Sequence, residues 1–419
     1  MHFHIKPAAR FLAPYFIAFC IMLTYGIVKS PIDSLFLHYQ SATRLPIVWI
    51  LVMIAIFVAI KLLNHFSSRH SMLRVFTGAS IASVFLLLVF CGLFYGYPIL
   101  SVYALAIWKE VYIVVLIEVF FSFLNLLHSV KAAKWAYGIM LACGSMGNAL
   151  GNFYVSGFVK SIGSMYSLYS SIPVFMLIIA FSLIWYRLQQ EDRVLKNQKY
   201  TVSQFSQVVG ILRASKYLAL LFCLVVLSQV AATLVEYELN SILAILYNNV
   251  DERSQVLSTI EAAINSLSFI MQIIGAFVFR FFGIGGTFVG IPLVLISSLV
   301  LFIVSAQTST IILTRITGKI FDYSLLRTAK EILYIPLSRP EKTHGKAMID
   351  IFAYRMARGF CSVLLLGLTA IEAGFMTTYC SLGIMIAWAM LAIIISTRFK
   401  EFSLVHEAET SSEDMQVPR

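Results

Sequence analysis

The chain has 419 residues, of which 60% are hydrophobic and only 12% are charged, and its formal net charge is +11. A soluble domain carries about 25% charged residues and about half apolar residues, so this composition excludes an ordinary soluble globular protein. Apolar stretches recur along the whole length and are too long for the strands of a barrel. The sequence therefore predicts an all-α polytopic membrane protein.

The chain begins with a short polar stretch, 1–10, that leads directly into the first apolar run. No small-residue cleavage site follows this run, so we interpret it as a first span and not as a cleaved signal. A helix that crosses a bilayer needs about 20 mostly apolar residues, and about twelve segments meet this requirement. The predicted spans are 11–28, 45–63, 75–97, 103–127, 137–159, 168–186, 217–239, 257–279, 286–306, 309–334, 347–369 and 376–397.

Lysine and arginine concentrate in alternate loops, which predicts the orientation of the chain. With a cytoplasmic N-terminus, the inner loops hold most of the basic residues. The outer loops then hold only Lys29, Arg44, Lys160 and Arg253. Both termini are therefore predicted to be cytoplasmic. Because the basic residues lie in loops that face the lipid bilayer, the positive charge does not indicate a nucleic-acid partner.

The longest loop, 187–216, is basic and separates six predicted spans from six. This predicts an N-terminal six-helix half (1–186), a cytoplasmic linker (187–216), a C-terminal half (217–397) and a cytoplasmic tail (398–419). Two six-span halves joined by a basic loop resemble the 6+6 arrangement of the major facilitator superfamily. The resemblance implies two related halves that rock around a site at the membrane midplane.

Ionisable side chains fall inside several predicted spans, where each costs at least a few kcal/mol and normally marks function. Spans four, seven and ten carry most of them, and Lys29 is predicted to cap the outer end of span one. In major facilitator proteins, spans one, four, seven and ten line the central cavity. This agreement predicts a solute path.

Span ten is the most informative segment. At about 100° per residue, Arg315, Lys319, Asp322 and Lys330 share a stripe of roughly 80°. Three cations and one anion on one face favour an anionic solute. The alternative is that these charges only pair with one another and do not contact a solute.

Other charged positions leave their roles open. Glu118, in the middle of span four, could be a proton relay, a partner for a lysine or a neutral buried acid. Glu236, near the outer end of span seven, could be exposed to water. Arg327 and Glu331 lie four residues apart, which favours a pair between them.

Glycines in span five recur at helical spacing, at Gly144, Gly147 and Gly151. Small residues at this spacing favour close packing between helices. The chain has no Walker A loop, no H-E-x-x-H and no G-x-S-x-G motif, so hydrolysis of ATP by the chain itself is excluded and no enzyme is predicted. No cofactor and no metal site are predicted either.

Two neighbouring segments carry a specific resemblance. The first runs F-D-Y-S-L-L-R-T-A-K-E-I-L-Y-I-P-L over 321–337, and the second runs K-T-H-G-K-A-M-I-D over 342–350, followed by Arg355. They resemble the F-D-x-x-K-E-x-x-Y-I-P-L and K-x-x-G-K-A-x-I-D motifs of the ATP/ADP translocase family of intracellular bacteria and plastids, a relative of the major facilitators. Leu234-Val235-Glu236 and Glu110 match further family positions.

The resemblance implies exchange of nucleotides or another phosphate-bearing anion by alternating access, with Glu110, Glu236 and Lys330 as transport-critical charges. It also implies a multi-pass protein of the bacterial inner membrane, and we expect a monomer. The family's L-R-x-x-K-D motif in span one has a second cation where this chain has Ile32. The alternative substrate is therefore another polyanion, such as a citrate-type siderophore or an organic phosphate. The candidate substrate-binding residues are Lys29, Glu110, Glu118, Glu236, Arg315, Lys319, Asp322, Lys330 and Arg355.

Overall fold

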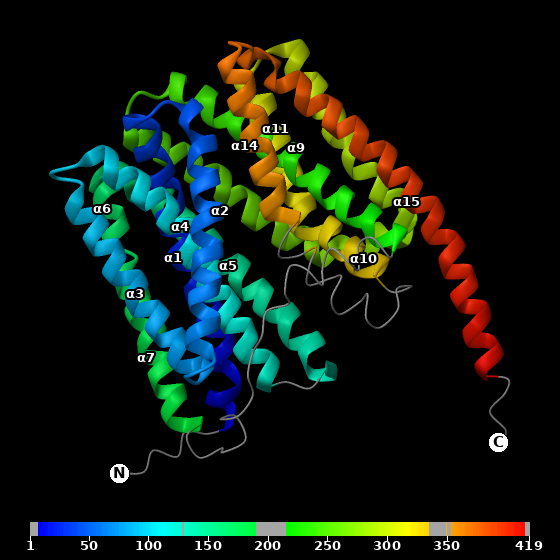
Figure 1. The fold of residues 1–419 in the computed structure, drawn as a ribbon, viewed down its shortest axis with the longest axis horizontal. Coiled ribbons are helices and arrows are strands. Elements are labelled where there is room, and N and C mark those ends of the chain that lie inside the picture. The colour runs from blue at the N-terminus through cyan, green and yellow to red at the C-terminus, as the bar shows by residue number, and fades with distance from the viewer. Residues whose placement is uncertain (1–6, 128–129, 190–214, 335–348, 350–352, 415–419) are drawn as a thin grey trace. The chain divides into compact units, whose positions relative to one another are not determined.

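The computed structural model describes residues 7–127, 130–189, 215–334, 349 and 353–414, and every regular element in these ranges is a helix (Figure 1). The first group of helices is α1 (Pro7–Tyr39), α2 (Leu45–Ser67), α3 (Met72–Leu93), α4 (Pro98–Leu127), α5 (Val130–Ile162), α6 (Ser164–Tyr169) and α7 (Ile172–Gln189). The second group is α9 (Lys216–Leu246), α10 (Val250–Ser305), α11 (Thr308–Phe321), α12 (Arg327–Leu333), α14 (Tyr354–Ala370) and α15 (Thr377–Asp414).

The prediction of an all-α membrane protein is confirmed for the described residues. Seven of the described helices are long and apolar enough to cross a membrane. The predicted spans on α4 and α5 are not among these seven, and three further features lower the number. α10 contains two predicted spans in one element of 56 residues, α11 has only 14 residues, and α14 has only 17. The count of about twelve spans and the cytoplasmic position of both termini stay predictions.

Glycines with positive φ end helices at two points where the predicted spans also end. Gly163 has φ 86° and separates α5 from α6. Gly283 has φ 68° inside α10 and divides it between the predicted spans 257–279 and 286–306. This region of φ is costly for residues with a Cβ, so glycine is the residue that can make both breaks.

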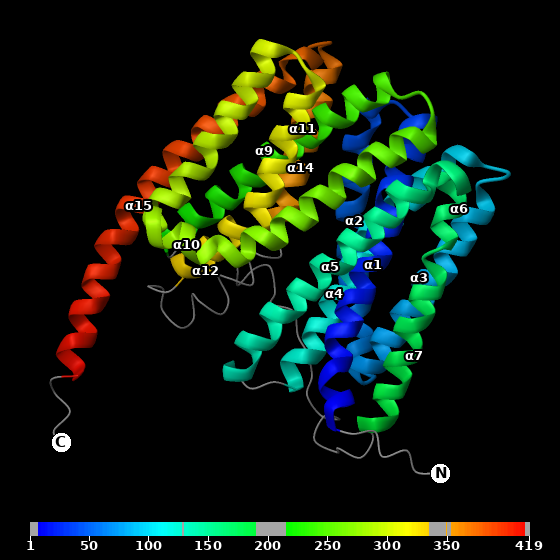
Figure 2. The same ribbon diagram turned by 180° about the vertical axis from the view of Figure 1, so that it is seen from behind.

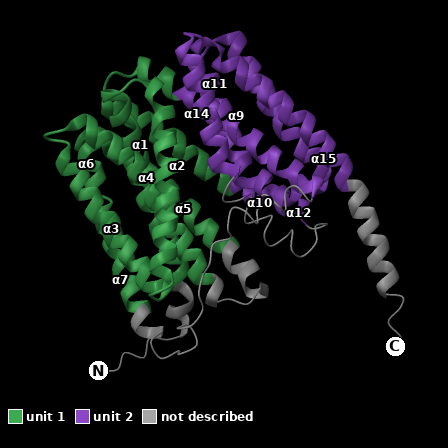
Figure 3. Cartoon of the chain, viewed as in Figure 1, with its two compact units in different colours: residues 1–202, 240–269 green, residues 203–239, 270–419 purple. Residues whose placement is uncertain are grey.

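The helices form two compact units, coloured separately in Figure 3. Unit 1 comprises Met1–Val202 and Asn240–Phe269, and unit 2 comprises Ser203–Leu239 and Ile270–Arg419. The predicted division into two six-helix halves stays a prediction. Most of the predicted linker, 190–214, lies outside the described residues.

Within unit 1, α1 is the central helix, because it contacts α4, α5, α6 and α7 (Figure 2). Its closest neighbour is α5, and the predicted role of the glycines in close packing is confirmed. A Cβ on Gly147 would collide with the carbonyl oxygen of Phe19, and a Cβ on Gly151 would lie 2.6 Å from the carbonyl oxygen of Leu23. Since backbones can approach this closely only at glycine, α5 sets the position of α1.

The segment 240–269 belongs to unit 1 because its polar side chains bind to that unit. The Asp251 carboxylate accepts hydrogen bonds from the backbone N–H and the hydroxyl of Ser164, both at 2.6 Å. Arg253 is 2% exposed, and its guanidinium donates to the carbonyl oxygens of Ser34, at 3.1 Å, and Tyr247. A buried guanidinium needs several acceptors, and here backbone carbonyls supply them.

Unit 2 surrounds an apolar core made by α9, the second part of α10, α11, α14 and α15. Buried members include Leu224, Phe288, Ile311, Leu365 and Ala392. The Tyr217 hydroxyl on α9 donates to the carbonyl oxygen of Leu333 at 3.1 Å, which ties the start of α9 to the end of α12. Between α11 and α12, the five residues Asp322–Leu326 form a π-helical segment.

We predict that Gly147→Ala destabilises the protein by about 1–3 kcal/mol, because the added methyl group forces α1 away from α5. The measurement is the thermal unfolding midpoint of the purified full-length protein in detergent. Gly157→Ala is the matched control, because Gly157 lies on the same helix with nothing within 4 Å of its Cβ position. Equal midpoints for the two variants would contradict close packing as the reason for Gly147.

Candidate functional site

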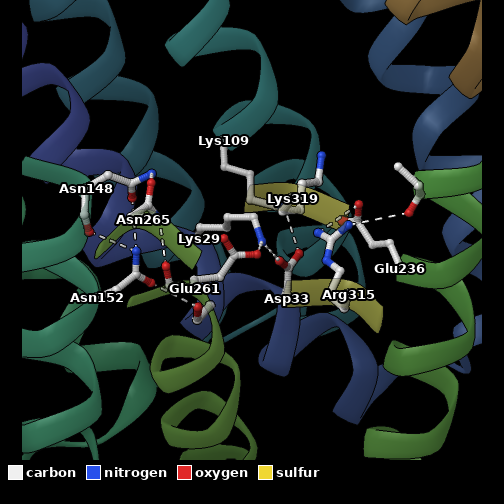
Figure 4. A network of polar contacts seen from close by, with 12 residues as sticks. Lys29, Asp33, Lys109, Asn148, Asn152, Glu236, Glu261, Asn265, Arg315 and Lys319 are labelled. Atoms are coloured by element: carbon white, nitrogen blue, oxygen red, sulfur yellow. Dashed lines mark hydrogen bonds and ion pairs between the residues drawn. The ribbon is translucent and has the colours of Figure 1, made fainter. Parts of the chain in front are cut away.

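Five charged side chains of unit 1 meet at one place, which we call the Lys29 cluster: Lys29, Asp33, Lys109, Glu110 and Glu261 (Figure 4). Lys29 Nζ lies 2.7 Å from Glu261 Oε1 and 3.6 Å from Asp33 Oδ2. Lys109 Nζ lies 2.8 Å from Asp33 Oδ1 and 2.9 Å from Glu110 Oε1. Asp33 therefore bridges the two lysines, and α1, α4 and α10 each contribute to the cluster.

The position of Lys29 differs from the prediction that it caps the outer end of span one. Helix α1 continues to Tyr39, so Lys29 and Asp33 lie one turn apart inside it. The side chains of the cluster are only 7–18% exposed. In such a setting a lone charge is very costly, and removing one partner of a buried pair typically costs about 3–5 kcal/mol.

Three asparagines extend the polar contacts of unit 1 beyond the Lys29 cluster. Asn148 Nδ2 on α5 donates to Asn265 Oδ1 on α10 at 3.1 Å, and Asn265 Nδ2 donates to the Glu261 carbonyl oxygen at 2.7 Å. Asn152 Nδ2 donates to the Asn148 carbonyl oxygen at 2.9 Å. All three are buried, at 0–6% exposure. They hold the helix turn that carries Glu261 against α5.

In unit 2, Glu236 on α9 lies between two arginines. Its Oε2 is 3.1 Å from Arg315 Nη2 on α11 and 3.9 Å from Arg358 Nη2 on α14. Arg315 Nη1 also donates to the Ala232 carbonyl oxygen at 3.5 Å. The sequence left open whether Glu236 is exposed to water. Its side chain is only 14% exposed because α9 continues to Leu246.

The second pair of unit 2 joins Lys319 and Asp322, whose Nζ and Oδ2 lie 3.6 Å apart. Gln229 Nε2 on α9 donates to Asp322 Oδ1 at 2.9 Å. Lys319 Nζ also lies 5.2 Å from the centre of the Tyr323 ring, a distance that allows a cation–π contact. The internal pairing that the sequence offered as an alternative is thus found for both Arg315 and Lys319. Contact with a solute stays a prediction.

Arg315, Lys319 and Asp322 line a partly open cavity of unit 2 with about 400 Å³ of empty space, which we call the α11 cavity. α9 contributes Ser228, Gln229 and Val235, α11 adds Thr314, and α15 adds Met385 and Trp388. Most of the remaining lining is apolar. Two cations and one anion give the lining residues a net positive charge.

Lys330 is not among the residues that line the α11 cavity, and its place in the predicted stripe stays a prediction. It lines a neighbouring cavity with Arg327, which shares Ser228 with the α11 cavity, and its Nζ lies 5.5 Å from the centre of the Tyr354 ring. The π-helical segment Asp322–Leu326 precedes it. Such a segment adds about one residue to a turn and turns all later residues back by about 100°, which moves Lys330 from one edge of the roughly 80° stripe to the other edge.

The remaining predicted residues have different environments. Glu110 joins the Lys29 cluster. Glu118 on α4 and Arg355 on α14 are both half-buried, and their proposed roles stay predictions. The pair between Arg327 and Glu331 also stays a prediction. Among the described residues, no group of three or more His, Cys, Asp or Glu side chains is arranged to hold a metal ion.

Sequence reasoning did not select Asp33, Lys109, Glu261 and Gln229 as site residues. Two signals were present in the sequence. Asp33 follows Lys29 at the i,i+4 spacing of a helical ion pair, and Lys109 directly precedes Glu110 inside a predicted span. No sequence signal could connect Glu261 to Lys29 or Gln229 to Asp322, because those pairs form between helices far apart in the chain.

Comparison with known proteins confirms the family resemblance. Residues 310–406 match the family described as TLC ATP/ADP transporter. A stretch of 229 residues is 28% identical to the ADP,ATP carrier protein 1 of Chlamydia pneumoniae and covers 48% of this chain and 44% of that protein. The chain thus matches less than half the length of this curated relative.

Solved structures share the fold. A point mutant of the nucleoside transporter NupG superposes with a TM-score of 0.66 at 12% identity, over 94% of this chain and 99% of that chain. A bacterial homologue of the iron transporter ferroportin in its inward-facing state gives 0.66 at 12% identity, over 92% and 98%. At this identity the likeness shows the fold alone. The chain therefore shares the fold of these two structures.

We predict that Arg315 and Glu236 are coupled by about 1–3 kcal/mol. Arg315→Met leaves the Glu236 carboxylate buried without its nearest cation, and Glu236→Gln removes that carboxylate. The double variant should therefore lose less unfolding free energy than the two single variants lose together. The measurement is a double-mutant cycle on unfolding in detergent. The exposed pair Lys160 and Glu252, 4.0 Å apart, is the control and should show coupling within about 0.5 kcal/mol. Equal coupling in both cycles would contradict the prediction.

Proposed function

We propose that this relative of the ATP/ADP translocases is a secondary transporter that moves an anionic nucleotide across a bacterial inner membrane by alternating access. The observation that carries the proposal is the set of lysines and arginines held inside membrane helices by carboxylates. The match of residues 310–406 to the family, the chlamydial relative and the transporter fold support it. We retain a monomer with two six-helix halves as part of the proposal.

The ion pairs suggest how an anion is bound. Lys29, Lys109, Arg315 and Lys319 are each within 4 Å of a carboxylate of the same unit. These carboxylates hold the cations in place while no substrate is present. Substrate phosphates are stronger, multidentate acceptors and would replace the carboxylates on the cations. The protein then exchanges one set of ion pairs for another, and this exchange limits the net cost of desolvating the anion.

Lys109 offers a replacement for the second cation of the family motif in span one, which this chain lacks. Ile32 stands at that position, and it is fully buried. Lys109 on α4 brings a second ammonium group to the Lys29 cluster, 2.8 Å from Asp33. We propose that Lys109 supplies the charge that Ile32 cannot, so the loss of the motif cation does not argue against a nucleotide.

The alternative substrate was another polyanion, such as a citrate-type siderophore or an organic phosphate. The similarities found do not favour it, because the matched family and the curated relatives are ATP/ADP carriers. Citrate therefore serves as a comparison substrate in the experiments below.

We predict that proteoliposomes containing the full-length protein take up labelled ATP or ADP when they are preloaded with unlabelled nucleotide. The measurement is counterflow of labelled ATP, ADP and citrate in parallel. Empty liposomes are the control. Citrate uptake without nucleotide uptake would contradict the nucleotide substrate, and no uptake of any anion would contradict the transport proposal.

We predict that two substitutions at one ion pair change the KM for nucleotide in opposite directions. Lys319→Ala removes a cation and should raise the KM at least about tenfold. Asp322→Asn removes the carboxylate that competes with substrate for Lys319 and should lower the KM, on the order of threefold. Initial rates of uptake at varied nucleotide concentration measure both.

Lys61→Ala is the control for this pair of variants, because Lys61 is exposed on α2. Membrane insertion of all three variants is checked by their yield in the membrane fraction. An unchanged KM in Lys319→Ala would show that the pair is structural. A raised KM in Asp322→Asn would show that Asp322 assists binding instead of competing with it.

A further inference from the structure

One residue that lines the α11 cavity, Trp388, has a hydrogen-bond donor without an acceptor among the described residues. The Trp388 side chain on α15 is 3% exposed and lines this cavity. Its Nε1 is buried, and no described residue accepts a hydrogen bond from it. A buried polar group left without a partner costs about 1–3 kcal/mol, so buried indole N–H groups usually have an acceptor.

Trp108 in unit 1 shows the usual arrangement. It is buried to nearly the same extent, at 4% exposure, and its Nε1 donates to the carbonyl oxygen of Ser83 at 3.2 Å. The fold can therefore satisfy an indole N–H by a local carbonyl. The contrast shows that burial of a tryptophan in this protein does not by itself leave the N–H unpaired.

The chemistry of the other groups in the cavity indicates what the missing partner is. An indole N–H, a guanidinium and an ammonium group are donors only. Arg315 already has the Glu236 carboxylate as an acceptor, and Asp322 is bound by Gln229 at 2.9 Å and lies 3.6 Å from Lys319, so neither carboxylate is left for the Trp388 N–H. A ligand group with acceptors alone and negative charge, an oxyanion, matches this set of donors.

We infer that Trp388 is a specificity-determining residue whose Nε1–H donates a hydrogen bond to an anionic oxygen of the transported solute. The inference rests on the proposed function. It means that an uncharged N–H donor binds the solute together with the cations already described. A phosphate of a nucleotide and a carboxylate of a polycarboxylate present the same oxyanion chemistry. The experiment has separate arms for ATP and citrate to distinguish the two sources.

The test is Trp388→Phe in the purified full-length protein, which keeps an aromatic ring and removes the N–H. The apparent Kd for the bound anion, measured by thermal shift titration with ATP, ADP and citrate, should rise about tenfold, equivalent to about 1.4 kcal/mol. The unfolding midpoint without ligand should stay the same or rise, because a buried donor without an acceptor has been removed. A merely structural tryptophan would lower that midpoint and leave the Kd unchanged.

Trp185→Phe is the matched control, because Trp185 is buried at 4% exposure in unit 1 and does not line the α11 cavity. Its Kd values should equal those of the wild type. Wild-type Kd values in Trp388→Phe, with binding intact in the wild type, would overturn the role of Trp388 alone. A wild type that binds none of the three anions would overturn the proposed function, and this inference with it.

A second measurement does not depend on that variant folding. The protein has five tryptophans, so indole ¹⁵N labelling gives five N–H resonances. The Trp388 signal is identified by Phe variants of the other four. Saturating ATP or citrate should move it downfield, as expected when an N–H gains an anionic acceptor. An unchanged Trp388 resonance at saturation would overturn the inference.

Discussion

A charge inside a membrane helix needs a partner of opposite charge, and this constraint organises both units of the protein. Lys29 and Lys109 are held by Asp33, Glu110 and Glu261, and Arg315 and Lys319 are held by Glu236 and Asp322. Because each isolated charge would cost several kcal/mol in such a medium, these pairs fix which helix faces meet. The same pairs hold the cations on which the proposed binding of an anionic solute depends.

The backbone packing of unit 1 makes its cluster possible. Gly147 and Gly151 let α5 contact the backbone of α1 directly. Asn148 and Asn152 lie on the same stretch of α5, and Asn148 bonds to Asn265 on the helix that carries Glu261. Close approach at glycine and hydrogen bonding at asparagine therefore act together. They set the position of Glu261 within 2.7 Å of Lys29.

In unit 2 the deciding feature is an irregular turn. The π-helical segment Asp322–Leu326 follows directly on α11. Such segments are rare and occur frequently at functional sites. Here the segment lies between Lys319, which lines the α11 cavity with Asp322 and Trp388, and Lys330, which lines a neighbouring cavity.

The sequence by itself determined the helical membrane class, most helix positions and the resemblance to the ATP/ADP translocases, because these follow from local apolar length, glycine and proline positions, and contiguous motifs. It also selected Arg315, Lys319, Asp322 and Glu236 as candidate site residues, since a charge is visible in any apolar segment. Only the tertiary structure decided the partners. The contacts of Lys29 with Glu261 and of Gln229 with Asp322 depend on how distant helices pack, and so does the N–H of Trp388 that is left without an acceptor in the described part of the chain. The π-helical segment Asp322–Leu326 is a backbone irregularity that no regular periodicity predicts.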